Sequence, residues 1–404
     1  MPEETPHTFA HARRAGTGPG GLVRELHEQG PVNRIVPGAG ADADGAPVWL
    51  VTGHREVRRV LGDHTRFGIQ GRFSPRPLDG VSDRARPREV VGHLMAYDPP
   101  EHTRLRGMLT SAFTARRLRR LQPAIETAVE GCLDDMEDGG PPADLMELFA
   151  WPVSGAALCE LIGVPRDDRH DVLRWIRWQL DEERTPQQRA VARDACTSYL
   201  GALVGRRRAA PDEGFIGSLV REHGDEFTDE ELRGICAHLF AAGLDNAAGM
   251  IGLGVLALLE HPEQLAAVRQ DASAADRVTD ELLRYLSVVH AATPRIATED
   301  VTLGDRLVRA GDRVICSIPM ANRDPALAPD ADRLDAIRDP VPHVAFGHGV
   351  HHCIGAALAR LELRTAYLAL LRRFPGLRLA VPAAHVKYRA DAIAYGVEGL
   401  PVAW

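Results

Sequence analysis

The sequence predicts a mainly α-helical protein with minor β-sheets, and three observations carry this prediction. Apolar residues recur with helical spacing over 101–286. Within that stretch a capping box, Thr228-Asp-Glu-Glu, opens a segment that stays apolar to Glu260. This predicts one helix of about 30 residues, near 45 Å long at about 1.5 Å per residue. After Arg284 short alternating runs separated by Gly and Asp indicate small strands and hairpins.

The remaining elements follow in chain order. Residues 1–20 are polar and rich in Gly and Pro, which predicts a flexible N-terminal arm. Residues 48–53 predict a strand followed by a turn, and 75–88 lack any period, as a loop that covers a substrate pocket would. A last strong helix is expected over 353–373, followed by short strands. Because no repeat or linker interrupts the pattern, 21–404 is predicted to be a single domain.

Composition and charge restrict the class of protein. Hydrophobic residues make up 45% and charged residues 26%, the balance of a globular protein. The formal net charge of −8 argues against a general affinity for nucleic acid or anionic lipid. The N-terminus lacks the apolar run of a signal peptide, and no run of about 18 uncharged apolar residues is present. A cytoplasmic monomer with no membrane and no nucleic-acid partner is therefore expected.

Cysteine is the first candidate for chemistry. The six cysteines form no CxxC pair, so neither a disulfide framework nor a structural zinc site is expected. Cys353 differs from the others because three glycines surround it in Phe346–Gly355, just before the last predicted helix. Glycines permit tight turns and close approach of backbone to a flat ligand, and a helix N-terminus stabilises a thiolate. Taken alone, such a cysteine is more often a small core residue.

The whole loop is far more specific than its cysteine. Its pattern of Phe346, Gly347, Gly349, His351, Cys353 and Gly355 closely resembles the haem-binding loop of the cytochrome P-450 family. The resemblance implies the cytochrome P-450 fold, with haem b between the long central helix and the Cys-bearing loop and helix. It makes Cys353 the axial iron ligand and places Phe346, Gly347, His351 and Gly355 in contact with the haem. An axial thiolate pushes electron density toward the iron and favours cleavage of the O–O bond.

Glu281 and Arg284 stand three residues apart on one face of a predicted helix and can pair. Taken alone this is a common arrangement on solvated helices. In the family that the loop resembles, the same ExxR pair is buried and braces the fold beneath the haem loop together with a later arginine. Arg338 is the candidate for that third member.

The resemblance extends over nearly the whole chain. Further matches to the soluble bacterial branch are Asp98-Pro-Pro-Glu-His-Thr-Arg-Leu-Arg106, Ala321-Asn-Arg-Asp-Pro325 and the closing Gly399-Leu-Pro-Val-Ala-Trp404, which suggests a complete C-terminus. His102 and Arg106 are four residues apart on a predicted helix, so both can point at one anionic group. By resemblance these two residues, with Arg295 and His351, hold the haem propionates. The alternative for Arg295 and His351 is an ordinary surface charge.

The central helix contains Ala241–Ala248, which resembles the oxygen-binding segment of the family. There a glycine makes room for dioxygen and an acid–threonine pair manages protons. Here the acid is Asp245, but Asn246 replaces the threonine. A hydroxyl donates and accepts through one atom, whereas a carboxamide divides these roles between two atoms. Asn246 could position water itself, a substrate hydroxyl could supply the missing group, or the reaction could need the relay less, as oxidative coupling would.

The family architecture also suggests which residues line the substrate pocket. They are Leu94, Leu239, Ala242, Gly243, Val288, Val289, Ala292 and Ile393. The substrate would be a small organic molecule, free, glycosylated or tethered to a carrier protein. Electrons would come from a ferredoxin and a ferredoxin reductase. The basic run Arg116, Arg117, Arg119 and Arg120 could dock an acidic ferredoxin, or could simply be a solvated helix face.

The resemblance implies a haem-thiolate monooxygenase that oxidises a specialised, antibiotic-like metabolite in bacteria. Hydroxylation with dioxygen is the leading expectation. Oxidative coupling and the use of peroxide are alternatives on the same fold. A non-catalytic scaffold that activates a partner enzyme is a further reading, but helpers of that kind in the family have a degenerate haem loop, and this loop is intact.

Overall fold

The computed structural model describes residues 16–35, 48–69, 91–181, 183–270, 275–389, 392 and 394–404. Most of the predicted N-terminal arm, the predicted loop over 75–88 and Ile393 lie outside the described residues. The chain divides into two compact units. The first comprises Met1–Arg88, Met95–Thr103 and Asp280–Cys353, and the second comprises Glu89–Leu94, Arg104–Thr279 and Ile354–Trp404. A single domain over 21–404 stays a prediction.

The first unit is built on a five-stranded sheet of order β1-β2-β8-β5-β3. Its strands are β1 (Val32–Ile35), β2 (Val48–Val51), β3 (Phe67–Gly68), β5 (Arg295–Ala297) and β8 (Arg313–Cys316). β2 and β8 pair in parallel, and the other neighbours pair antiparallel. The strand predicted at 48–53 is thus confirmed as β2. A separate hairpin joins β6 (Val301–Leu303) to β7 (Arg306–Val308), as the short alternating runs predict.

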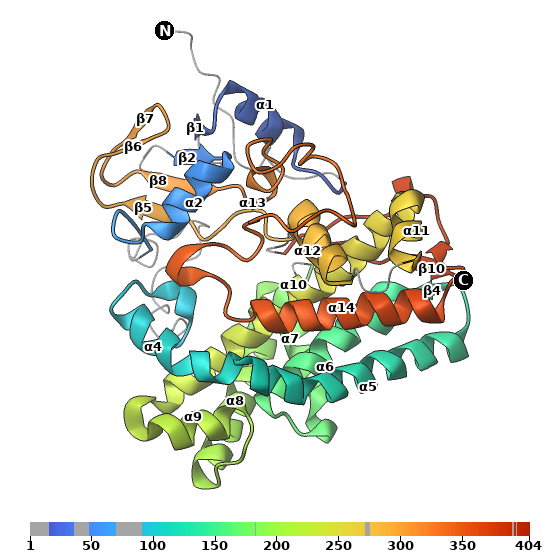
Figure 1. The fold of residues 1–404 in the computed structure, drawn as a ribbon. Coiled ribbons are helices and arrows are strands. Elements are labelled where there is room, and N and C mark those ends of the chain that lie inside the picture. The colour runs from blue at the N-terminus through green and yellow to red at the C-terminus, as the bar shows by residue number, and fades with distance from the viewer. Residues whose placement is uncertain are drawn as a thin grey trace. The chain divides into compact units, whose positions relative to one another are not determined.

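The first unit also contains helices. They are α1 (Gly21–Gln29), α2 (His54–Gly62), α13 (Ile318–Ala321) and the short η9 (Gly349–His351). Val57, Val60 and Leu61 of α2 share a buried apolar cluster with residues of the sheet such as Val51 and Val314. Figure 1 shows α2 in blue beside β2 and β8. Apolar burial of this kind supplies most of the stabilisation of such a unit.

The second unit is helical, and its longest element is α10 (Asp229–Glu260), the helix predicted from the capping box. The Thr228 hydroxyl accepts a hydrogen bond from the Glu231 backbone at 3.1 Å, and the Glu231 carboxylate accepts one from the Thr228 backbone at 2.8 Å. α10 is apolar and long enough to cross a membrane. However, 78% of its most apolar window is buried inside the protein, as in the core helix of a globular unit.

Seven further α-helices of the described chain lie entirely in the second unit. They are α5 (Ala115–Gly139), α6 (Trp151–Ile162), α7 (Arg169–Leu180), α8 (Pro186–Ala209), α9 (Phe215–His223), α11 (Pro262–Gln270) and α14 (Ala356–Arg373). α10 contacts α6, α8 and α14, and α14 runs alongside α5, as Figure 1 shows in red and teal. A small sheet of order β4-β10-β9 joins Ala143–Asp144, Pro401–Ala403 and Arg378–Leu379.

Two helices, α4 (Glu101–Thr110) and α12 (Ala275–Leu286), have residues in both units. Short helical turns complete the described chain at η3 (Leu94–Ala96), η4 (Ser111–Phe113), η5 (Met146–Ala150), η6 (Arg166–Asp168), η7 (Gly224–Glu226) and η10 (Ala383–His385). The expectation of a helical body followed by small strands is therefore confirmed.

Candidate haem site

The loop around Cys353 is closed by its own backbone. The Cys353 N–H donates a hydrogen bond to the Phe346 carbonyl at 2.8 Å. Gly347 and Gly349 have φ values of +74° and +73°, which a side chain would strain. A Cβ on Gly349 would also lie 2.5 Å from the Leu61 carbonyl oxygen, so α2 approaches the loop too closely for any side chain there. The loop leaves Cys353 exposed.

The last helix starts later than predicted. α14 begins at Ala356 with Gly355 as its N-cap, so the expected start at Cys353 is wrong by three residues. The reason is local: residues up to Cys353 belong to the closed loop, and its backbone N–H is bonded back to Phe346 rather than into a helix. Cys353 therefore lies just ahead of the first turn of α14, whose free N–H groups still favour negative charge nearby.

Glu281 and Arg284, the predicted ExxR pair, form a buried ion pair. Arg284 is 1% exposed and Glu281 is 3% exposed, and two hydrogen bonds of 2.7 Å join them. Arg338 donates from Nε to the same carboxylate at 3.2 Å, so it is the third member that the sequence suggested. A planar guanidinium matches a carboxylate in such a two-bond geometry.

Arg284 is also linked to the segment before the Cys353 loop by hydrogen bonds through Asn322. Its Nη1 donates to the Asn322 carbonyl at 2.7 Å, and its guanidinium meets the carbonyls of Ala331 and Arg333. The Asn322 side chain accepts from the Val344 backbone at 2.7 Å, two residues before Phe346. The ion pair is therefore connected by hydrogen bonds to the chain just before the loop. Sequence reasoning placed Asn322 in a family match at 321–325 but assigned it no role.

Three of the predicted propionate residues are buried basic side chains of the first unit. They are His102 on α4, His351 on η9 and Arg295 at the start of β5. The rings of His102 and His351 lie 4.2 Å apart between centroids, and His351 Nε2 is 4.0 Å from the Asp98 carboxylate. Arg106 lies one turn after His102 on α4 and is half-buried. The alternative of a surface charge is thus wrong for Arg295 and His351.

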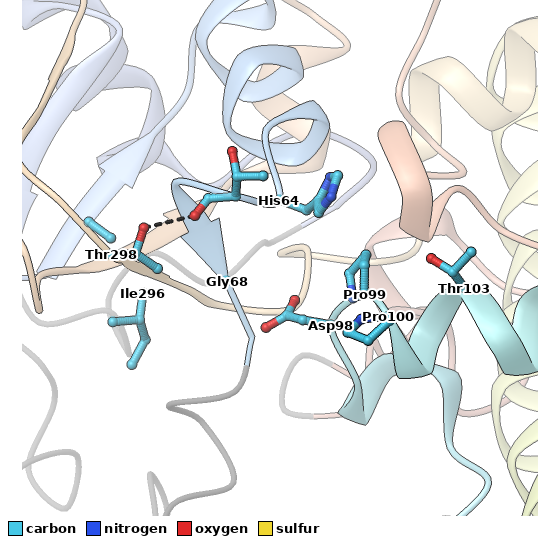
Figure 2. A pocket seen from close by; sticks show the side chains of 10 residues that line it. His64, Gly68, Asp98, Pro99, Pro100, Thr103, Ile296 and Thr298 are labelled. Atoms are coloured by element: carbon cyan, nitrogen blue, oxygen red, sulfur yellow. Dashed lines mark hydrogen bonds between the residues drawn. The ribbon is translucent and has the colours of Figure 1, made fainter.

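A cavity of about 800 Å³ opens near the start of α4 (Figure 2). Its lining residues are His64, Thr65, Gly68, Asp98, Pro99, Pro100, Thr103, Ile296, Ala297 and Thr298. Of the residues predicted to line a substrate pocket, none that the structure describes is among them. Figure 2 shows the Asp98 carboxylate between Gly68 and the two prolines. Asp98 accepts a hydrogen bond from the Ile69 backbone at 2.8 Å, which joins β3 to the start of α4.

The central segment of α10 is unusual for a core helix because Ala241 and Ala242 are exposed. Gly243, by contrast, has a packing reason of its own: a Cβ there would lie 2.8 Å from the Leu158 side chain of α6. Small exposed side chains in mid-helix are what a flat ligand or a gas molecule would need.

The two polar residues of this segment, Asp245 and Asn246, make different contacts. Asn246 Nδ2 donates to the Ala242 carbonyl at 2.7 Å, while its Oδ1 is buried with no hydrogen-bond partner among the described residues. Asn246 thus presents an acceptor and no hydroxyl. The Asp245 carboxylate is buried and is paired with Arg389 at 2.6 Å. Burial raises the pKa of Asp245, and Arg389 offsets only part of that rise.

Comparison with known proteins agrees with this geometry. A model of the cytochrome P450 family matches residues 187–377. Cytochrome P450 165B3 from Amycolatopsis orientalis is 53% identical over 404 residues, which is the full length of both chains. The chain belongs to the cytochrome P450 family.

Two solved structures of cytochromes P450 are also similar along nearly the whole chain. OxyB from teicoplanin biosynthesis, in complex with the X-domain, is 55% identical with a TM-score of 0.87, over 98% of this chain and 99% of that one. OxyC, implicated in an oxidative C–C coupling reaction during vancomycin biosynthesis, is 46% identical with a TM-score of 0.90 over the full length of both. The predicted cytochrome P450 fold is confirmed, and the chain is an oxidoreductase related to enzymes of antibiotic biosynthesis.

The residues present fit the haem that the family implies. An exposed thiol follows a glycine-rich turn, and buried basic side chains suit two carboxylates, which need paired partners when they leave water.

The residues predicted to line the substrate pocket differ in their burial. Leu94 and Val288 are buried, Leu239, Gly243, Val289 and Ala292 are half-buried, and Ala242 is exposed. Their joint role as a substrate pocket stays a prediction.

The basic run on α5 is partly used inside the protein. Arg117 pairs with Glu222 of α9 and donates to the Ser218 hydroxyl. Arg116, Arg119 and Arg120 are exposed. Only these three are open to a docking partner.

Proposed function

We propose that the chain is a haem-thiolate enzyme that holds haem b through the Cys353 thiolate. His102, His351 and Arg295 would bind the propionates, with Arg106 as the fourth candidate. Phe346, Gly347 and Gly355 would shape the loop beneath the ring, and the ion pair of Glu281 with Arg284 and Arg338 would brace it. The buried basic side chains and the exposed thiol support this assignment, because each matches a chemical group of haem.

The proposed reaction is oxidative coupling within a precursor of a vancomycin-type or teicoplanin-type antibiotic. The full-length similarity to OxyB and OxyC carries this proposal. The Asn246 geometry supports it, because a side chain that only accepts here does not replace the hydroxyl of an acid–threonine pair. Electron-rich aromatic rings are the chemical class that such a reaction joins. Hydroxylation, the leading expectation from sequence alone, becomes the second reading.

The coupling reaction balances in atoms and electrons without adding oxygen to the product. Two C–H or O–H bonds of the substrate break, one bond forms between the two rings, and the substrate loses two electrons and two protons. Dioxygen takes those electrons together with two from an external donor and leaves as water. The bound haem supplies this redox chemistry. The chain's own residues orient the substrate and hold or pass protons at Asp245 and Asn246.

Partners and location follow from the same proposal. The exposed residues Arg116, Arg119 and Arg120 would dock an acidic ferredoxin, itself reduced by a ferredoxin reductase. A substrate tethered to a carrier protein is proposed because OxyB forms a complex with an X-domain. We further propose that the chain acts in the cytoplasm as a monomer.

The test uses the haem-loaded protein, a ferredoxin and its reductase, and carrier-bound peptides with two phenolic rings. Under isotope-labelled dioxygen, coupling predicts a product that has lost two hydrogen atoms and contains no label. A labelled oxygen atom in the product would instead establish hydroxylation. Equal product from peroxide without reductase would remove the need for the ferredoxin.

A further inference from the structure

The Asp245 carboxylate is fixed to the C-terminal hairpin. Arg389 Nη1 lies 2.6 Å from Asp245 Oδ1, with side chains 18% and 6% exposed, and the Ala394 backbone N–H donates to the same carboxylate. Arg389 and Ala394 both belong to the segment that follows α14, whereas Asp245 is in the middle of α10. One carboxylate therefore ties the middle of the core helix to two points of the hairpin.

The hairpin itself is held by short-range contacts. Tyr388 pairs with Val397 in an antiparallel bridge, and the Arg389 N–H donates to the Gly396 carbonyl at 2.9 Å. The rings of Tyr388 and Tyr395 stack at 5.6 Å with an interplanar angle of 5°. Residues 389 and 394 thus stand on opposite arms near the turn. A carboxylate that accepts from both Arg389 and Ala394 fixes both arms to α10.

A tryptophan holds Arg389 from a second side. The Arg389 guanidinium lies 5.5 Å from the centroid of the Trp151 ring on α6, within the range of a cation–π contact. Arg177 of α7 lies 5.0 Å from the same ring and is bonded at 3.0 Å to Glu147. Because Glu147 engages Arg177, the second cation on the ring is itself neutralised. Arg389 is thus restrained by an aromatic ring as well as by Asp245.

We propose that Arg389 is a positioning residue that keeps the Asp245 carboxylate ionised and latched to the C-terminal hairpin, so that Asp245 exchanges protons only when the hairpin loosens. Asp245 is buried, and among the described residues the charged side chain that acts on its ionisation is Arg389. The latch stands on these contacts alone. Its consequence for catalysis rests on the proposed function, in which Asp245 handles protons.

The latch gives Asp245 and Asn246 different roles. The Asn246 amide is bonded to its own helix, and its oxygen can only accept. Asp245 is therefore the group of this pair that can take up a proton and pass it on, and it does so only after leaving Arg389 and Ala394.

The test compares haem-loaded wild type with Arg389→Gln, Arg389→Lys and Asp245→Asn. The infrared band of the Asp245 carboxyl, identified by its loss in Asp245→Asn, is titrated with pH. The latch predicts that Arg389→Gln raises the pKa of Asp245 by at least one pH unit, which lowers the ratio of its ionised to its protonated form about tenfold or more. Arg389→Lys should restore most of the wild-type titration. Arg177→Gln, which changes the other cation on Trp151, should leave it unmoved.

Backbone amide exchange over 388–397 gives a second readout that needs no turnover. Exchange there should become faster in Arg389→Gln and in Asp245→Asn, and not in Arg177→Gln. An unchanged Asp245 titration in Arg389→Gln, or unchanged exchange in both variants, would overturn the latch. If both readouts change as expected but the product carries labelled oxygen, the latch stands and the proposed coupling function fails.

Discussion

Glu362 provides a quantitative test of how the second unit is packed. This residue lies on α14, is 3% exposed, and burial raises its pKa from 4.5 to about 7. The difference of about 2.5 units corresponds to about 3.4 kcal/mol at about 1.36 kcal/mol per unit. Ionising Glu362 in the folded protein therefore lowers the free energy of unfolding by about that amount.

The sign follows from proton binding. Between pH 4.5 and pH 7 the folded protein holds the Glu362 proton while the unfolded chain releases it. The stabilisation is fully present below pH 4.5 and is lost as the pH rises through about 7. Glu362→Gln keeps the shape and cannot ionise, so we expect it to match wild type at low pH and to be more stable by about 3 kcal/mol at pH 8.

The assay is equilibrium urea unfolding of the haem-loaded protein across this pH range. Glu263→Gln, at an exposed position on α11, is the matched control and should show no pH-dependent difference. Stability curves of wild type and Glu362→Gln that run parallel at all pH values would refute the reasoning. They would mean that burial does not change the pKa of Glu362 between the unfolded and the folded protein.

Three further predictions test other parts of the structure. Arg284→Met should lower the free energy of unfolding by about 3–5 kcal/mol, because it leaves the buried Glu281 carboxylate without its two-bond partner; a loss below about 1 kcal/mol in urea unfolding would contradict this. Gly349→Ala should lower haem content per chain, since its Cβ meets backbone, whereas Gly131→Ala meets nothing within 4 Å and should raise the melting temperature slightly. Thr228→Ala should destabilise by about 1 kcal/mol, measured by chemical denaturation, through loss of the α10 capping box.

Features that depend on local pattern could be predicted from the sequence. The capping box at Thr228 fixes the start of α10 because its two hydrogen bonds lie within four residues. The pair of Glu281 with Arg284 is likewise local, since both residues lie on one face of α12. The Cys353 loop could be recognised because its glycines hold backbone conformations that few other residues adopt.

Features that depend on tertiary contacts could not be predicted from the sequence. Nothing near Arg389 in the sequence indicates that it meets Asp245, which is 144 residues away. Nothing in the sequence indicates that Leu158 leaves no room for a side chain at Gly243. Nor does it indicate that the Asn322 side chain accepts a hydrogen bond from the Val344 backbone. The late start of α14 escaped prediction because a loop closed by a backbone bond to Phe346 leaves no mark in the apolar spacing.

The central claim is that the Cys353 thiolate binds the haem iron. The most direct measurement is the absorption spectrum of the reduced carbon monoxide complex. Wild type should show the band of thiolate-bound haem, Cys353→Ala should lose it, and Cys132→Ala, at a half-buried thiol on α5, should keep it. A Cys353→Ala protein that binds haem and retains the thiolate band would contradict the account.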